Sequence, residues 1–380
     1  MHLSTFLQSF LTILIVASIR LNIKYYNSRS EEKMMVNKNC FSKLLLFINA
    51  KNYQIINQKT GKIILTSSFL FLIINAFIPI ASAQKAVILN FDDDWKGQLT
   101  YAVPILEKYG FNASFYVTTG CLTYQNSSFC NNAGGESAMT WDDIKVLSEL
   151  GYDIQSHGVS HKDLTTLSAD ELEYEVAQSK QSLLEHGINS TIFGPPYAAG
   201  WGNSTIVDTV MKYYDMSRVG YGPLVHLNCD WAYDENGMQK TNQTDCKTYF
   251  DNGTLTLANR YSLPVITDYE AQAMYRDNNT KIFDIFIEDV NSQTQYNTNG
   301  TINAIPIMVY HNIDYKNSSW ANSSPDWIVH STTDAGLFDM EMKYLHDNGF
   351  EVFAISDLGY NQTSNRLYIK NDTDDSFQTK

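Results

Sequence analysis

The stretch KAVILNFDDD, from Lys85 to Asp94, is the part of the 380-residue sequence that decides the fold. Ala86 to Phe91 is an almost continuous apolar run, which is typical of a strand buried on both faces in a parallel sheet. Three carboxylates follow at once, and the carboxyl ends of parallel strands are where active sites gather. Adjacent carboxylates repel one another, so a divalent cation is expected to compensate them; a solvated acidic turn is the alternative.

Outward from this strand, short apolar runs alternate with amphipathic stretches, which predicts an α/β fold around a parallel sheet or barrel. Residues 221–303 are rich in Asn, Asp and Thr and are interpreted as surface excursions between core strands. Further strands are expected at residues 113–117, 152–156, 191–193, 216–219, 305–310 and 351–355, and helices at 103–109, 141–150, 168–185, 205–213 and about 335–348.

The chain is expected to hold one catalytic domain at residues 85–360, after a leader at 1–84 and before a loose polar tail at 361–380. The leader carries two apolar runs, 6–19 and 63–83. The second ends in Ala81, Ser82 and Ala83, the small-residue pattern that a signal peptidase cuts. Its length of about 20 residues also permits an uncut membrane anchor. We therefore expect a protein that is secreted or held at the cell surface by residues 63–83.

Cysteine usage favours an oxidising compartment, because Cys40 lies in the leader and the other four cysteines form two close pairs in sequence. Local pairing would join Cys121 with Cys130 and Cys229 with Cys246; free buried thiols are the alternative. Asn-X-Ser/Thr acceptors for glycosylation are frequent, among them Asn112, Asn126, Asn203, Asn252, Asn317 and Asn371.

The charge balance excludes some partners. The formal net charge is −14 and the sequence pI is near 4.9, whereas nucleic acids and anionic membrane surfaces select for Lys and Arg. A neutral or cationic substrate fits better.

His157 and His161 follow another predicted strand at a spacing of four, which would place both imidazoles on one face of a helical turn. Together with one carboxylate they would form a two-His, one-carboxylate metal site with positions left open for water and substrate. Two unrelated surface histidines are the alternative.

Two weaker signals follow later strands. Pro195 and Pro196 stiffen a turn and leave the amide of Tyr197 free to point at a ligand, although most such turns are only turns. His311 comes directly after the apolar run Ile305 to Tyr310, where a single His is more often structural.

Four motifs in this order resemble the polysaccharide deacetylases of carbohydrate esterase family 4: NFDD at 90–93, SHGVSH at 156–161, FGPPY at 193–197 and PIMVYH at 306–311. The resemblance spans about Lys85 to Asp357. It implies a distorted (β/α)7 barrel that removes acetyl groups from an N-acetylated polysaccharide or oligosaccharide.

The resemblance also implies roles. Asp92 would be the catalytic base and His311 the general acid, and the backbone amide of Tyr197 would help to stabilise the oxyanion. Asp93, His157 and His161 would hold a divalent metal ion, with Zn²⁺ expected.

Two departures leave other functions open. Asp94 stands where the family usually has Gly, and Gly194 stands where it has an Arg that orients the catalytic Asp. A non-catalytic carbohydrate-binding protein on the same fold is therefore the first alternative. An iron oxygenase with two His and one carboxylate is the second, although it leaves Asp92 and His311 without a role.

Overall fold

The chain divides into two units, Met1–Pro79 and Ile80–Lys380. The computed structural model describes residues 84–123, 138–200, 203–222, 224–227, 248–249, 255–256, 258–275, 278–297, 300–315, 326–361 and 366–370, all in the second unit. The two apolar runs of the predicted leader lie outside these residues, so export and anchoring stay predictions. Across the described ranges, no helix combines the length and the apolar character needed to cross a membrane.

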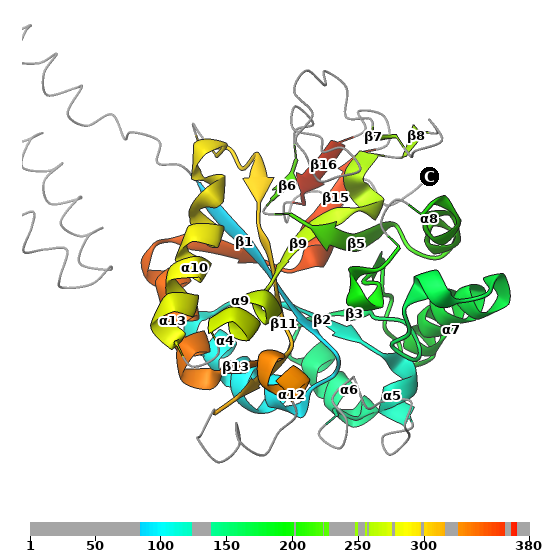
Figure 1. Cartoon of the computed structure of the whole chain (residues 1–380), viewed down its shortest axis with the longest axis horizontal. Helices are drawn as coiled ribbons and strands as arrows, with labels where there is room; N and C mark the ends of the chain where they lie inside the picture. Colours follow the sequence, from blue (N-terminus) through cyan, green and yellow to red (C-terminus); the bar gives the residue numbers. More distant parts are fainter. Residues whose placement is uncertain are drawn as a thin grey trace, which may run out of the picture. The chain divides into compact units, whose positions relative to one another are not determined.

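Seven parallel strands close into a barrel (Figure 1), which confirms the expected (β/α)7 fold. The ring closes because β1 pairs with β2 on one side and with β11 on the other. In ring order the strands are β1 (Lys85–Asp92), β2 (Ser114–Val117), β3 (Asp153–Ser156), β4 (Ile192–Phe193), β5 (Met216–Tyr221), β9 (Leu263–Thr267) and β11 (Ile307–Tyr310).

Helices surround the barrel, and those predicted from sequence lie within two residues of their expected bounds. A capping box of Ser168 and Glu171 begins α7, and Gly110 ends α4 in the left-handed conformation, with φ 69°. The helices are α4 (Val103–Tyr109), α5 (Thr119–Thr123), α6 (Trp141–Glu149), α7 (Ala169–Glu185), α8 (Ser204–Met211), α9 (Asp268–Tyr275), α10 (Asn279–Asn291), α12 (Asp326–His330) and α13 (Ala335–Asp347).

The alternation of side chains along β1 fixes where its acidic end points. Val87, Leu89 and Phe91 pack in the cluster between the barrel and its helices, and the Phe91 ring stacks on Phe115 at 4.9 Å between centroids. Ala86 and Ile88 belong to the cluster inside the barrel. Because side chains of a strand alternate between faces, Asp92 continues the interior row and enters the barrel at its carboxyl end.

The interpretation of residues 221–303 as surface excursions is wrong for a large part of that segment. It contains the barrel strand β9, whose Leu263 and Val265 are buried, and the helices α9 and α10. Three pairs of short strands lie outside the ring among the described residues. They are β6 (Val225–His226) with β10 (Ala304–Ile305), β7 (Thr248–Tyr249) with β8 (Leu255–Thr256), and β12 (Asn312–Asp314) with β13 (Thr332–Asp334).

The C-terminal part also differs from the expected loose tail. Strand β14 (Phe350–Phe353) pairs with the first half of β1 outside the ring, and β15 (Leu358–Asn361) forms an antiparallel hairpin with β16 (Arg366–Ile369). Leu358 and Leu367 of this hairpin join the interior cluster, so the domain extends past residue 360.

The predicted disulfides and most glycosylation sites fall on segments that the structure does not describe. Cys121 is buried in α5, whereas Cys130, Cys229 and Cys246 lie outside the described residues. Asn112 and Asn203 are exposed, as acceptors must be. Both modifications stay predictions.

Candidate active site

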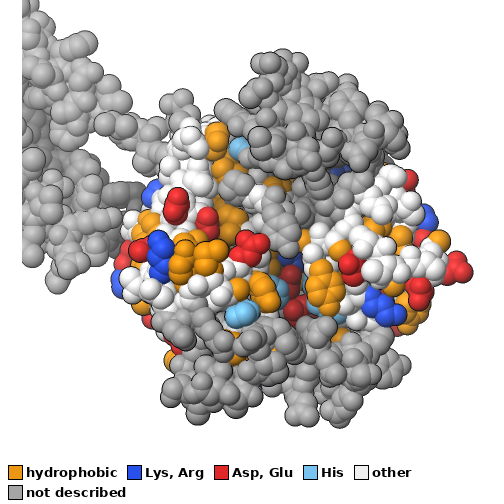
Figure 2. Space-filling model, viewed as in Figure 1, with side chains coloured by type: hydrophobic (Ala, Val, Ile, Leu, Met, Phe, Trp, Pro, Cys, Tyr) orange, Lys and Arg blue, Asp and Glu red, His pale blue; other side chains and the backbone are white. Residues whose placement is uncertain are grey.

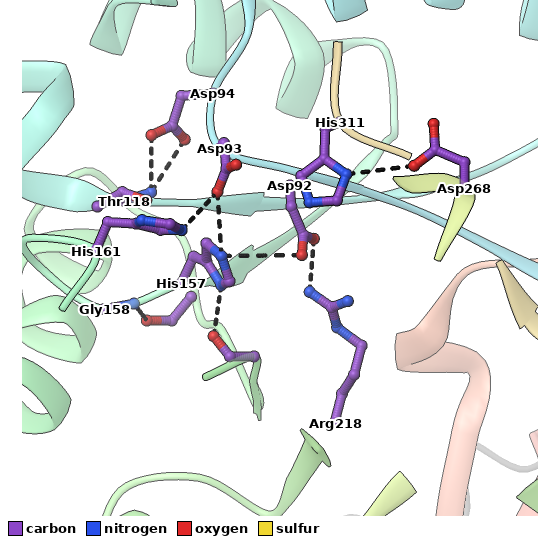
Figure 3. A network of polar contacts seen from close by, with 12 residues as sticks. Asp92, Asp93, Asp94, Thr118, His157, Gly158, His161, Arg218, Asp268 and His311 are labelled. Carbon is purple, nitrogen blue, oxygen red and sulfur yellow. Dashed lines mark hydrogen bonds and ion pairs between the residues drawn. The ribbon is translucent and has the colours of Figure 1, made fainter. Parts of the chain in front are cut away.

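The polar side chains singled out in the sequence gather at the carboxyl ends of the barrel strands (Figure 3). Asp92 ends β1 and Asp93 follows it directly, His157 follows β3 and His311 follows β11. In Figure 2 acidic and histidine atoms lie together at the centre of one face, with hydrophobic side chains on both sides of them.

Asp93, His157 and His161 form the predicted triad. One ligand atom from each lies within 4.8 Å of the others. The Asp93 Oδ1 atom is 3.2 Å from His157 Nε2 and 2.9 Å from His161 Nε2, and all three side chains are less than a tenth exposed. Three buried side chains therefore converge on one point.

The chemistry of the triad fits a divalent cation. No well-aligned hydrogen bond reaches Asp93 Oδ1. His157 Nδ1 donates to the carbonyl oxygen of Gly194 at 2.5 Å, which leaves Nε2 as the ring nitrogen that faces Asp93. Burial alone would raise the pKa of Asp93, but the neighbouring His161 and His157 hold it well below its usual range, so this carboxylate is ionised.

The two histidines do not share a helical turn, and that prediction is wrong. Residues 157–161 form a loop in which Gly158 and His161 both have positive φ, 82° and 55°. The loop is held by Glu175 of α7, which is 3% exposed. Its Oε2 accepts the backbone N–H groups of Val159 and Ser160 at 2.8 and 2.9 Å, and the Ser160 hydroxyl donates to Oε1.

Asp92 is paired with Arg218, which projects from β5 into the barrel. Arg218 Nη2 donates to Asp92 Oδ1 at 2.5 Å, and both residues are 5% exposed. The other carboxylate oxygen, Oδ2, lies 3.8 Å from His157 Nε2 and so faces the triad. The geometry leaves one oxygen of Asp92 beside the triad, where a base would act.

His311 is paired with Asp268, the first residue of α9, directly after β9. His311 Nδ1 lies 3.3 Å from Asp268 Oδ1, and the Thr333 hydroxyl donates to the second oxygen of Asp268. Burial lowers the pKa of His311, but its hydrogen bond with Asp268 and the charges of Asp93, Asp268 and Asp92 outweigh burial and raise the pKa to about 9. The imidazole is therefore protonated at neutral pH, the form that a general acid needs.

Residues 80–218, which include the triad and Arg218, match the model of the family described as polysaccharide deacetylase. Over this part of the chain, the protein therefore resembles the polysaccharide deacetylases.

A putative polysaccharide deacetylase of Bacillus subtilis is 23% identical over 159 residues, which is 42% of this chain. The match spans about half of that relative, 49% of its length. Among solved structures, a family 4 carbohydrate esterase from Streptomyces lividans in complex with acetate is 14% identical, with a TM-score of 0.41, covering 76% of this chain and 100% of that one. A family 4 pseudoenzyme from Bacillus anthracis is 12% identical, with a TM-score of 0.42, covering 72% and 64%.

Asp94, the first departure from the family pattern noted in the sequence, points away from the triad (Figure 3). Both of its carboxylate oxygens lie 3.0 Å from the backbone N of Thr118, and its own backbone has φ 58°. Burial, together with Asp92 and Asp93, raises the pKa of this carboxyl well above its usual range. The side chain therefore ties the end of β1 to the end of β2 and is directed away from Asp92.

Tyr197 lies at the rim of the candidate site. Its ring centroid is 4.7 Å from that of His161, the residue is 53% exposed and its φ is 60°. The two prolines before it set up the expected turn, and the strained backbone at Tyr197 is typical of functional positions.

Sequence reasoning missed Arg218, Asp268 and Glu175. Asp268 carries the signal that found the other residues, a polar group directly after a buried strand. Arg218 and Glu175 lie within a strand and a helix, where nothing in the local sequence sets them apart from surface charges.

Proposed function

We propose that this protein is a metal-dependent hydrolase that removes acetyl groups from N-acetylated sugars of a polysaccharide. The observation that carries the proposal is the convergence of Asp93, His157 and His161 with a paired carboxylate, Asp92, and a protonated imidazole, His311. A base and an acid beside one cation site are what amide hydrolysis requires.

In this proposal Asp93, His157 and His161 hold a divalent ion, for which Zn²⁺ suits the donor set of two nitrogens and one oxygen. When bound, such an ion supplies Lewis-acid chemistry, which polarises a carbonyl oxygen and makes water a stronger nucleophile near neutral pH. The hydrogen bond from His157 to the Gly194 carbonyl orients one ligand for this task.

The remaining side chains move the protons. Asp92 takes a proton from the attacking water as the water oxygen bonds to the acetyl carbon. The backbone N–H of Tyr197 donates to the carbonyl oxygen as negative charge develops there. The C–N bond then breaks, and His311 protonates the leaving nitrogen, which gives acetate and a free amino sugar.

The test is acetate release from N-acetylglucosamine oligomers by the purified full-length protein, as the zinc-loaded and the metal-stripped form. Asp92→Asn is expected to abolish release while zinc remains bound, whereas Asp208→Asn, on the exposed face of α8, is expected to leave it unchanged. Oligomer binding without acetate release from any N-acetylated sugar would instead support the non-catalytic carbohydrate-binding protein.

A further inference from the structure

Two residues stand out in this site, Arg218 and Gly194. The family that the motifs resemble usually has, at the position of Gly194, an Arg that orients the catalytic Asp. Arg218 reaches the same carboxylate from β5, with its Nη2 2.5 Å from Asp92 Oδ1. Both partners are almost fully buried, where a charge-assisted hydrogen bond is strong and a lone charge is costly.

The guanidinium occupies the space beside Gly194. It lies over the Tyr116 ring, with Cζ 4.0 Å from the centroid. A Cβ atom at Gly194 would come within 2.9 Å of Arg218 Nη2 and within 2.6 and 2.8 Å of two Tyr116 ring carbons. No side chain fits at position 194 while Arg218 and Tyr116 stay in place. The glycine and the arginine therefore depend on one another.

The Asp92 side chain needs a restraint, because it lies close enough to the triad to rotate toward it. Its Oδ2 is 3.8 Å from His157 Nε2, and Asp93 Oδ1 is 3.2 Å from the same nitrogen. A rotation of the Asp92 side chain toward the triad would add its carboxylate to the ligands. A carboxylate bound to the ion is no longer free to accept a proton from water.

We propose that Arg218 is the positioning residue for Asp92: it fixes the carboxylate in the orientation of a base and keeps it from joining the metal ligands, and Gly194 provides the space for its guanidinium. The inference rests on the proposed deacetylase function. The motif FGPPY at 193–197 lacks the Arg that the family has there. The inference implies that Arg218, inside the barrel, takes over the role of that Arg.

The first test measures zinc affinity of the full-length protein by competition with a chelating dye. Arg218→Met frees Asp92, so we expect zinc affinity to rise on the order of tenfold, since ligand charge and number set affinity. The gain should be absent when Asp92→Asn is combined with Arg218→Met. If zinc affinity rises equally with Asp92 and with Asp92→Asn, the rise reflects only the lost positive charge. If zinc affinity does not rise at all, Asp92 needs no restraint. Either result overturns the proposal. Arg260→Met is the matched control, since Arg260 stacks on Tyr261 and Tyr360.

The second test measures kcat and KM. Arg218→Met is expected to lower kcat about 100-fold with zinc bound and KM little changed, because a small displacement of a reacting group has that effect. Arg218→Lys should recover part of the loss. Gly194→Ala should displace both the Tyr116 ring and the guanidinium, so it is also expected to lower kcat.

A loss of kcat in Arg218→Met that follows the zinc content would contradict the assignment of Arg218. If the wild-type protein releases no acetate, the proposed function fails, and the zinc-affinity cycle alone decides the role of Arg218. If Arg218→Met does not fold, Arg218→Lys carries both measurements.

Discussion

His311 shows how strongly the neighbours of one residue set its chemistry. Its imidazole is protonated at neutral pH because carboxylates outweigh its burial. His311→Ala is expected to lower kcat by about 10²- to 10⁴-fold, the usual contribution of a general acid, without loss of bound zinc. His346→Ala, on the exposed surface of α13, is the control and should change neither quantity. An unchanged kcat in His311→Ala would remove the residue from the mechanism.

The pH dependence of kcat follows from the same residue. A general acid works while it is protonated, so activity should fall as pH rises through the pKa of His311. That pKa is raised from 6.5 to about 9. A cation on the triad would offset the charge of Asp93, so the alkaline fall is expected between these two values.

Asp268→Asn removes the carboxylate that contacts His311 and should move the alkaline fall of kcat toward lower pH by on the order of one unit. The profile of kcat against pH for the two proteins measures the shift. A profile that stays in place would mean that Asp268 does not set the protonation of His311.

At the scale of elements, the loop that carries the two histidines depends on α7. Glu175→Ala would leave the buried N–H groups of Val159 and Ser160 without their acceptor, which costs about 1–3 kcal/mol for each group. We expect zinc affinity to fall about 10- to 100-fold, as happens when groups that support metal ligands are lost. Glu173→Ala on the same helix is the matched control, since Glu173 forms only surface contacts with Lys212 and Tyr213. Equal zinc affinities in the two variants would contradict a supporting role for Glu175.

The elements that sequence predicts well are those with a clear apolar period and an end signal. The strand before Asp92 and the capped helix α7 are of this kind. Strand β9 lacks the period because Leu263–Thr267 is short and contains Pro264, and proline argues against a central strand. Helix α10 does carry a signal, since its buried Ile282, Phe286 and Val290 are spaced by four residues.

The residues of the candidate site also fall into two groups, those that the sequence can reveal and those that it cannot. Residues at strand ends, such as Asp93 and His311, can be found because a polar group after an apolar run is conspicuous in sequence. The partner of Asp92 cannot, because the inward direction of Arg218 depends on barrel closure and on the space left at Gly194. The positive φ of His161 also cannot be predicted from the sequence, because the spacing of four between His157 and His161 suggests a helix instead.

At the scale of the whole domain, the hairpin of β15 and β16 completes the interior cluster. A chain that ends after Tyr360 loses Leu367, which is 6% exposed. Because deletion of a buried Leu side chain costs about 2–5 kcal/mol, we expect the free energy of unfolding to fall by at least about 2 kcal/mol. Urea unfolding would measure this against a chain that ends after Lys370. Equal stability of the two chains would show that the domain ends at residue 360.

The closure of the ring through β1 has a consequence for the order in which the chain is synthesised. Strand β1 emerges early, but β11, its partner on one side, begins only at Ile307. Asp93, His157 and His161 are all made well before that point, whereas His311 follows it. Domains generally fold as units, so the barrel can close only after Ile307–Tyr310 has been made. A growing chain therefore holds Asp93, His157 and His161 before it holds the strand that closes the barrel, and His311 is added only after that strand.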